Sequence, residues 1–371
     1  MAKTVNKSNK SSVSSVSSDV GIDVKIKQIL KKEQIDLQTS ELVLNFSGKS
    51  VTPELVNTVR RLTLDHVPMY AFHRNNIYIE KNTSIFNNDQ MKLHLSQIII
   101  PNLVNNIYYL DQEYWDQVDF SNPNRKKHPQ DTRLLEMYIH GENKTVENID
   151  ITTNNSKIFE DGIQLPNKFN EKYPRLIIQL RPGEIFSCRR VASLAIGKLN
   201  NIWSATRNAY YSYESEDING DINGDPKEII FHIHSHNQMD EYEILYKSCL
   251  VLKIKLENIK NNITETFKKP EYKNINKITI ILENEDHTIA NLLNTYLQLN
   301  KNVVFCGLSK PNLLIDRMVI KLEVNHDDPL KEILLTIEHI DAIFESIKEQ
   351  IHMLGKKFIT FNINENKKSK K

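Results

Sequence analysis

The feature that most constrains the fold is a strand–loop–helix pattern that occurs twice, once towards each end of the chain. The first copy reads ELVLNF and then SVTPELVNTVRRLTL (residues 41–64). The second reads KITIIL and then EDHTIANLLNTYLQL (residues 277–299). Aligning Asn57 with Asn291 superposes the two helices without a gap. An internal repeat of this kind predicts two related units within one chain.

Both repeated helices are predicted to be amphipathic. Thr52 can cap the first helix, with Pro53 at its first turn, and Asp286 can cap the second. Apolar residues at spacings of four and three form one face of each helix: Leu55, Val59 and Leu62 in the first, and Ile289, Leu293 and Tyr296 in the second. The opposite polar faces carry Asn57, Arg60 and Arg61 in the first helix, and Asn291, Asn294 and Thr295 in the second.

The adjacent arginines leave three interpretations open. Such a pair can belong to a solvated helix face, or its guanidinium groups can bind carboxylates, backbone carbonyls or phosphates in a docking surface. Binding to nucleic acid is the weaker interpretation, because the pair has neither interleaved aromatic residues nor a basic neighbourhood.

Each half of the chain also ends in a predicted long helix with apolar residues at alternating spacings of three and four. A narrow apolar seam of this kind needs a second helix against it, so the two seams are expected to pair within the chain. Asp328 and Pro329 predict the start of the second helix. The residues expected to pair are Leu245, Cys249, Leu252, Leu256 and Ile259 in the first helix, and Ile333, Ile337, Ile340, Phe344, Ile347 and Ile351 in the second.

Composition places broad limits on the function. A chain of 371 residues has room for about two domains, and its net charge of +1 lacks the basic excess of a protein that wraps DNA. No apolar run reaches the length needed to cross a bilayer, and the polar N-terminus has no signal-peptide pattern, so an intracellular protein is expected. Cys188, Cys249 and Cys306 form no CxxC pair, which argues against a disulfide framework and a structural zinc site.

The same patterns predict the domain boundaries. Residues 1–38 are expected to be a disordered Ser/Lys-rich tail, and residues 261–276, polar and containing Pro270, to be a linker. Short strand-like segments broken by Asn, Pro and Gly predict an inserted, mostly β domain. The remaining ranges are a discontinuous first unit at 39–80 and 176–260, the insert at 81–175, a second unit at 277–358 and a basic tail at 359–371.

A metal-dependent enzyme is the alternative from another functional class. In FHIHSH, the alternation of His232, His234 and His236 predicts one shared strand face. Same-face neighbours lie about 6 to 7 Å apart on a strand, which is too far for all three to reach one ion at about 2 Å. A stoichiometric metal that is lost from the His234→Ala variant would favour this alternative. A third interpretation, a DNA-binding module that uses the tails, predicts a steep salt dependence of binding.

Three segments resemble the α-like subunits of multisubunit RNA polymerases. VNTVRRLTLDHVP (56–68) and LRPGEIFSCRRVASLAIGKLNNIWSATRNAYYSYE (180–214) are similar to the large subunit, the third of the eukaryotic enzyme. LENEDHTIANLLNTYLQLNKNVVFCGLSKPNLLIDRMVIKLEV (282–324) is similar to the small subunit, the eleventh. The residues that carry this second match are His287, Thr288, Asn291, Leu292, Leu293, Val304, Phe305, Gly307 and Pro311.

This resemblance implies an α+β fold in which two paralogous dimerisation units are fused as an intramolecular pseudo-heterodimer. It implies a subunit without catalytic residues or cofactors, on which the largest and second-largest subunits assemble, with small partners of the tenth and twelfth type. The face that meets the second-largest subunit would contain Asn57, Arg60, Arg61, Gly183, Gly197, Lys198 and Trp203. A fusion of this type resembles the subunit arrangement in large cytoplasmic DNA viruses. It implies that the protein is located in the host cytoplasm and the virion if it is viral, or in the nucleus if it is cellular.

The sequence departs from the family pattern at three places. Many large α-like subunits hold zinc or an iron–sulfur cluster in the insert, but residues 81–175 contain no cysteine, so no such site is expected. Asn200, Asn201 and Ile202 replace a usual His-Ala-Lys run before Trp203. Asn294 replaces a usual arginine, so only the first unit is expected to present guanidinium groups and the two units to bind unequal partners.

Overall fold

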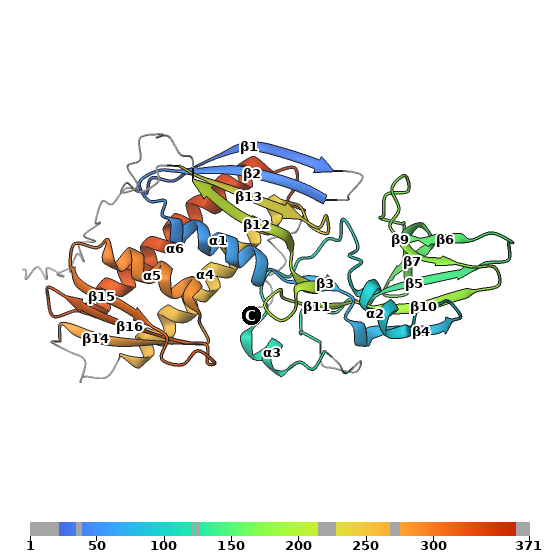
Figure 1. Cartoon of the computed structure of the whole chain (residues 1–371). Coiled ribbons are helices and arrows are strands. Elements are labelled where there is room, and N and C mark those ends of the chain that lie inside the picture. Colours follow the sequence, from blue (N-terminus) through green and yellow to red (C-terminus); the bar gives the residue numbers. More distant parts are fainter. Residues whose placement is uncertain are drawn as a thin grey trace, which may run out of the picture.

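A computed structural model describes residues 22–34, 39–120, 122, 127–213, 228–267 and 275–360. The chain has a mixed α+β fold in which helices cover antiparallel sheets (Figure 1). Its helices are α1 (Pro53–Asp65), α2 (Asn88–Ser96), α3 (Gln112–Gln117), α4 (Glu241–Thr266), α5 (His287–Gln298) and α6 (Pro329–Gly355). Short 3-10 turns occur at Arg74–Asn76, Thr153–Asn155 and Asn201–Trp203.

The first sheet combines strands from both ends of the first half. Its antiparallel order is β1-β2-β13-β12, with β1 at Lys25–Gln34, β2 at Thr39–Ser47, β12 at Thr206–Tyr213 and β13 at Glu228–Ser235. Alternate residues such as Leu42, Leu44 and Phe46 are fully buried, as the two-residue period of a half-buried strand requires. Helices α1 and α4 cover this apolar face.

The second sheet is smaller and has the antiparallel order β14-β16-β15, with β14 at Lys277–Glu283, β15 at Val303–Ser309 and β16 at Arg317–Val324. Ile278, Ile280 and Leu282 alternate with exposed residues along β14. Helices α5 and α6 pack on this sheet. Strand β14 and helices α5 and α6 therefore repeat the arrangement of β2, α1 and α4 in the first half.

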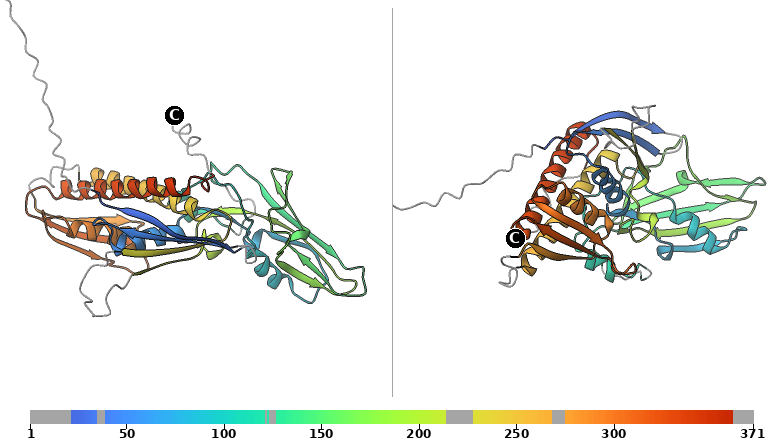
Figure 2. Two further views of the ribbon diagram at one scale, coloured as in Figure 1. Left: turned by 90° about the horizontal axis from the view of Figure 1, so that it is seen from above. Right: turned by 60° about the vertical axis from the view of Figure 1, so that its left-hand side comes forward.

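Helices α4 and α6 pack along one another in opposite directions, and both views of Figure 2 show them next to each other. Near one end, a Cβ added to Gly355 would lie only 2.4 Å from Cβ of Tyr242, so the backbone of α6 packs directly on the Tyr242 side chain there. Towards the other end, Lys260 Nζ lies 2.7 Å from Glu338 Oε1. Every seam residue named from the heptad pattern is buried in the same hydrophobic cluster.

Helices α1 and α5 also pack together, a contact that the sequence patterns did not indicate. The Thr58 hydroxyl lies 3.2 Å from the backbone oxygen of Thr288, and the Tyr296 hydroxyl donates a 2.7 Å hydrogen bond to the backbone oxygen of Ser50. The first contact joins the two repeated helices directly, and the second joins α5 to the loop before α1. One continuous core therefore runs through both halves of the chain.

Residues 70–196 form a second core, which we call the β block. Its main sheet has the order β4-β10-β5-β7-β8, and two short sheets pair β11 with β3 and β6 with β9. Figure 1 shows the block beside the helical half of the molecule. The strands are β3 (Met69–Ala71), β4 (Ile77–Asn82), β5 (Leu135–Glu142), β6 (Ile149–Thr152), β7 (Ser156–Glu160), β8 (Ile163–Leu165), β9 (Leu176–Leu180), β10 (Ile185–Val191) and β11 (Ser193–Ala195).

The structure moves several predicted boundaries. The insert was expected at 81–175, but β3 and most of β4 precede residue 81, and β9, β10 and β11 pair with strands of the β block. The block therefore runs from about residue 70 to residue 196. The linker expected at 261–276 is helical through Thr266, because its apolar residue Ile263 extends the buried side of α4. Residues 268–274 lie outside the described residues.

The expected N-terminal tail contains a strand. Residues 25–34 form β1, whose backbone is held by α6: Gln350 accepts a 2.9 Å hydrogen bond from the Ile26 amide and donates a 2.8 Å bond to the Val24 oxygen. Lys25, Lys27, Lys31 and Lys32 lie along this edge strand, where charge is usual. Residues 1–21 and 361–371, most of the two predicted tails, lie outside the described residues.

The Ile340→Ala variant tests the shared core. Ile340 is fully buried in α6, so we expect its truncation to lower the free energy of unfolding by about 2 to 5 kcal/mol. Met353→Ala, on the same helix at a position that is 73% exposed, is the control and should change this free energy by less than about 0.5 kcal/mol. Urea denaturation measures both, and equal effects would contradict the assignment of α6 to the core.

Candidate functional site

Helix α1 has the capped start and the two faces that its sequence predicts. The Thr52 side chain accepts a 3.2 Å hydrogen bond from the Leu55 amide, and Pro53 occupies the first turn. Leu55, Val59 and Leu62 are fully buried. Asn57, Arg60 and Arg61 lie on the other side and are partly exposed. Caps at Asp286 and Asp328 are confirmed in the same way.

The two arginines have different environments. Arg61 Nη2 lies 3.3 Å from Asp286 Oδ2 of the second half and 3.6 Å from Asp65 Oδ2. Arg60 Nε donates a 2.9 Å hydrogen bond to Asn57 Oδ1, and no carboxylate of the described ranges lies within ion-pair distance of its guanidinium group. Arg61 therefore links the two halves, whereas Arg60 can bind an external acceptor.

Burial and hydrogen bonding shift the pKa values around Arg61. Burial acts to raise the pKa of Asp286, but hydrogen bonds from Thr288 and the charge of Arg61 outweigh it and lower this pKa. The pKa of Asp65 is raised, because burial outweighs the attraction of Arg61. Burial and the nearby Lys255 and Lys198 lower the pKa of His66 to about 3, so its imidazole is neutral at physiological pH.

Gly197 and Lys198 lie against the end of α1. A Cβ on Gly197 would approach the backbone oxygen of Leu64 to 2.1 Å, so only glycine allows this approach. The Lys198 amide donates a 2.9 Å hydrogen bond to the Asp65 oxygen, and its Nζ lies 2.8 Å from Asp316 Oδ2 in the β15–β16 loop. These contacts extend the polar face of α1 towards the second half.

Trp203 and Gly183 do not belong to this face. Trp203 is only 2% exposed, its indole donates a 2.9 Å hydrogen bond to the Ser193 oxygen, and it packs with Ala71 and Ala195. Gly183 lies in the turn before β10, where its φ of +81° suits glycine. Gly197 follows β11, so strands β10 and β11 separate the two glycines along the chain.

Sequence reasoning did not identify Asp286 and Asp316 as ion-pair partners of this face. Each belongs to the second half, and only the packing of the halves brings it near α1 or Lys198. The apolar tip of the β15–β16 loop was also missed: Leu313 is 83% and Leu314 94% exposed beside Asp316. Consecutive exposed leucines in a loop are a sequence signal that could have been noticed.

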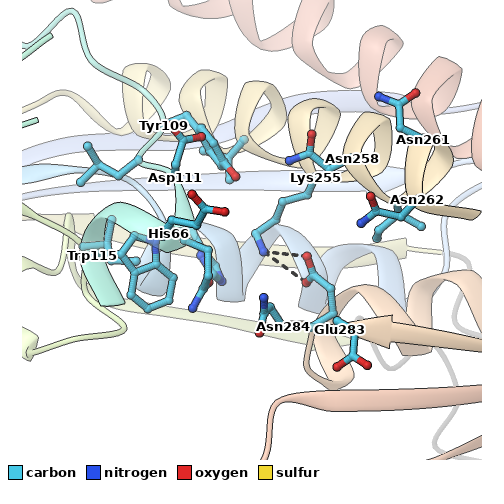
Figure 3. A pocket seen from close by; sticks show the side chains of 17 residues that line it. His66, Tyr109, Asp111, Trp115, Lys255, Asn258, Asn261, Asn262, Glu283 and Asn284 are labelled. Carbon is cyan, nitrogen blue, oxygen red and sulfur yellow. Dashed lines mark hydrogen bonds and ion pairs between the residues drawn. The ribbon is translucent and has the colours of Figure 1, made fainter. Parts of the chain in front are cut away.

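A cleft of about 550 Å³ lies where the end of α1, the segment containing α3, the middle of α4 and the β14–α5 loop meet. Figure 3 shows His66, Tyr109, Asp111, Trp115 and Lys255 around it. Lys255 Nζ lies 2.9 Å from Glu285 Oε1 and 3.2 Å from its Oε2. The remaining wall is rich in asparagine and carboxylate groups, at Asn258, Asn261, Asn262, Glu283 and Asn284.

The histidine strand has a different arrangement from a three-histidine metal site. His232 Nδ1 and His234 Nε2 lie 3.7 and 3.8 Å from Glu41 Oε1, and both rings stack with Tyr210. His236 follows the end of β13, and burial together with nearby arginines lowers its pKa to about 4. In the described part of the chain, no group of three or more His, Cys, Asp or Glu residues is placed to hold a metal ion.

None of the helices formed by the described residues has both the length and the apolar composition that crossing a membrane requires.

Comparisons with known proteins point to one group of transcription proteins. Residues 277–350 match the family model of the RNA polymerase Rpb3/Rpb11 dimerisation domain. The chain is 26% identical over 367 residues to an Acanthamoeba polyphaga mimivirus protein named as a DNA-directed RNA polymerase subunit, with 93% of this chain and 99% of that protein covered. It is 29% identical over 83 residues to a Caenorhabditis briggsae protein named as subunit RPAC2 of RNA polymerases I and III, with 22% of this chain and 57% of that protein covered.

Asp286→Asn tests the ion pair between the halves. Asparagine can still cap α5, so the substitution removes mainly the charge, and we expect a loss of about 1 kcal/mol at neutral pH because Arg61 is partly screened by solvent. Since folding lowers the pKa of Asp286, its stabilisation is complete above the ordinary value of 3.8 and is lost as the pH falls through the folded-state value. Thermal unfolding at several pH values measures the difference, with Asp327→Asn, at an exposed site, as the control. A loss that is independent of pH would argue against the charge.

Proposed function

Because this chain is a homologue of the Rpb3/Rpb11 type of RNA polymerase subunit, as its motifs predicted, we propose that it is a non-catalytic assembly platform of a DNA-directed RNA polymerase. In this proposal the chain contains the large and the small α-like unit, fused and paired with each other. The two catalytic subunits assemble on the outer surfaces of that pair.

The observation that carries the proposal is the pairing of the two repeated units. The arrangement of a sheet with two helices occurs in both halves, and α4 packs on α6 while α1 packs on α5. The buried seam residues occupy both long helices. Separate paralogous subunits would bury the same kind of surface between two chains, which supports the interpretation of an intramolecular pseudo-heterodimer with the β block as the insert of its first unit.

The docking face for the second-largest subunit is proposed to consist of Asn57, Arg60, Arg61, Gly197 and Lys198. Contacts around the end of α1 support this set, and Arg60 is its centre because its guanidinium group can bind a carboxylate or backbone carbonyl of the partner. Trp203 supports the face from the core, whereas Gly183, in the turn before β10, is left out of the proposed set. The largest subunit and small partners of the tenth and twelfth type remain proposals that rest on the family resemblance.

The metal-dependent enzyme gains no support from the geometry. His232 and His234 face a single carboxylate, Glu41, and a tyrosine ring, while His236 lies beyond the strand. A polar sheet face with stacked rings accounts for these histidines.

Arg60→Ala tests the docking role more cleanly than a substitution of Arg61, because Arg61 also connects the two halves. The tagged chain is co-expressed with the two largest polymerase subunits and purified. We expect the amount of second-largest subunit that co-purifies with the variant to fall by a factor of about ten or more, which corresponds to a loss of about 1.4 kcal/mol of binding energy. The double variant Arg60→Ala/Arg61→Ala should retain still less.

The control is Arg74→Ala, at an exposed arginine of the β block. It should retain the partner as the unmodified chain does, and thermal unfolding should show that Arg60→Ala is folded. Unchanged recovery of the second-largest subunit with Arg60→Ala and the double variant, after washing at about 0.5 M salt, would refute the proposed docking face.

A further inference from the structure

The cleft beside the docking face has the features of a binding site for a positively charged group. It begins where α1 ends, at His66, and Lys198 of the docking face stands over the ring of Trp115 at 5.3 Å. Segments from both halves and from the β block supply its walls (Figure 3). A partner that covers Lys198 would therefore also reach this opening.

The basic groups of the cleft offer little free positive charge. Lys255 is paired with Glu285 through both carboxylate oxygens, and Lys198 is paired with Asp316 at 2.8 Å. His66 is neutral, because burial and the adjacent lysines lower its pKa to about 3. Each cation that could attract an anionic ligand is thus already neutralised by a carboxylate.

Two acidic groups of the cleft have no such partner. Asp111 and Glu113, at the start of α3, are exposed, and no basic residue of the described ranges lies within ion-pair distance of either. The nearby Tyr109 responds to the negative potential: burial, together with the charges of Asp111 and Glu285, raises its pKa to about 12. The opening therefore carries an uncompensated negative charge.

The uncharged part of the wall suits a guanidinium group. Tyr109 supplies an aromatic ring, which attracts cations through its face, whereas Lys198 already stands over the buried ring of Trp115. Asn258, Asn262 and Asn284 supply amide oxygens that can accept hydrogen bonds from several N–H groups at once. A planar cation with five donors can use rings, amides and carboxylates together, which a compact ammonium group does less well.

We propose that this cleft binds an arginine side chain of the second-largest polymerase subunit, held by the carboxylates of Asp111 and Glu113. The inference rests on the proposed function, and it adds to the docking face an acidic recess of the opposite charge. Arg60 and this recess would then fix the orientation of the partner. A carboxylate of the partner must face Arg60, and an arginine of the partner must face the recess.

A competition experiment tests the proposal in the assembled complex. The unmodified chain and a differently tagged variant are co-expressed in equal amounts with the two largest subunits, and mass spectrometry measures the ratio of the two forms in the purified complex. For Asp111→Asn/Glu113→Gln we expect at least about tenfold preference for the unmodified chain, since two charge-assisted contacts are lost. Asp111→Lys/Glu113→Lys should be excluded more strongly.

The matched control is Glu147→Gln/Glu171→Gln, which changes the net charge equally at exposed positions of the β block that do not line the cleft. It should enter the complex as often as the unmodified chain. The substituted positions in the cleft are exposed, so thermal unfolding should show folded variants. Equal incorporation of both cleft variants and the unmodified chain would overturn the proposal while leaving the platform role intact.

Failure of the unmodified chain to assemble with the two largest subunits would contradict both the proposed function and this inference. The Arg60→Ala variant distinguishes the proposed docking face from the proposed arginine site in the cleft. If it is excluded from the complex while the cleft variants enter freely, the docking face is correct and the arginine recess is wrong.

Discussion

The burial of two helix seams against each other is the constraint on which the rest of the structure depends. Each sheet hides one face under helices, but α4 and α6 also carry apolar residues that their own sheets do not cover. Only the other half of the chain supplies a matching surface, so the seams exclude water when the halves pack. The ion pair between Arg61 and Asp286 then lies at the rim of a contact that is mainly apolar.

This packing also determines which polar groups remain available outside. The contact between α1 and α5 uses Thr58, Arg61 and the apolar side of α1, and leaves Arg60 with one neutral hydrogen-bond partner. The packing of the halves also brings Lys198 to Asp316. It supplies one wall of the cleft that Asp111 lines. The end of α1, the β block, α4 and the second half all line this cleft, so its acidic groups lie close to Lys198 because these parts meet there.

Local patterns predicted the elements with their own sequence signals. The helix starts at Thr52, Asp286 and Asp328, the apolar faces of the repeated helices and the two seams follow from capping chemistry and periodicity, which act within a few residues. Contacts between the halves could not be predicted in this way. Asp286 and Asp316 become ion-pair partners through three-dimensional packing. Strand β1 forms by pairing with β2, and Gln350, more than 300 residues away, binds the backbone at its start. The boundaries of the β block failed for the same reason, since strand pairing alone assigns β9 and β10 to it.

The packing of the two halves against each other is tested most directly by cutting the chain between them. A protease site introduced between residues 267 and 275 allows cleavage after folding, and size-exclusion chromatography without denaturant then shows whether the fragments stay together. A shared core predicts that both fragments elute as one complex and separate only when the protein is unfolded. Elution of two independent folded fragments under native conditions would contradict the account.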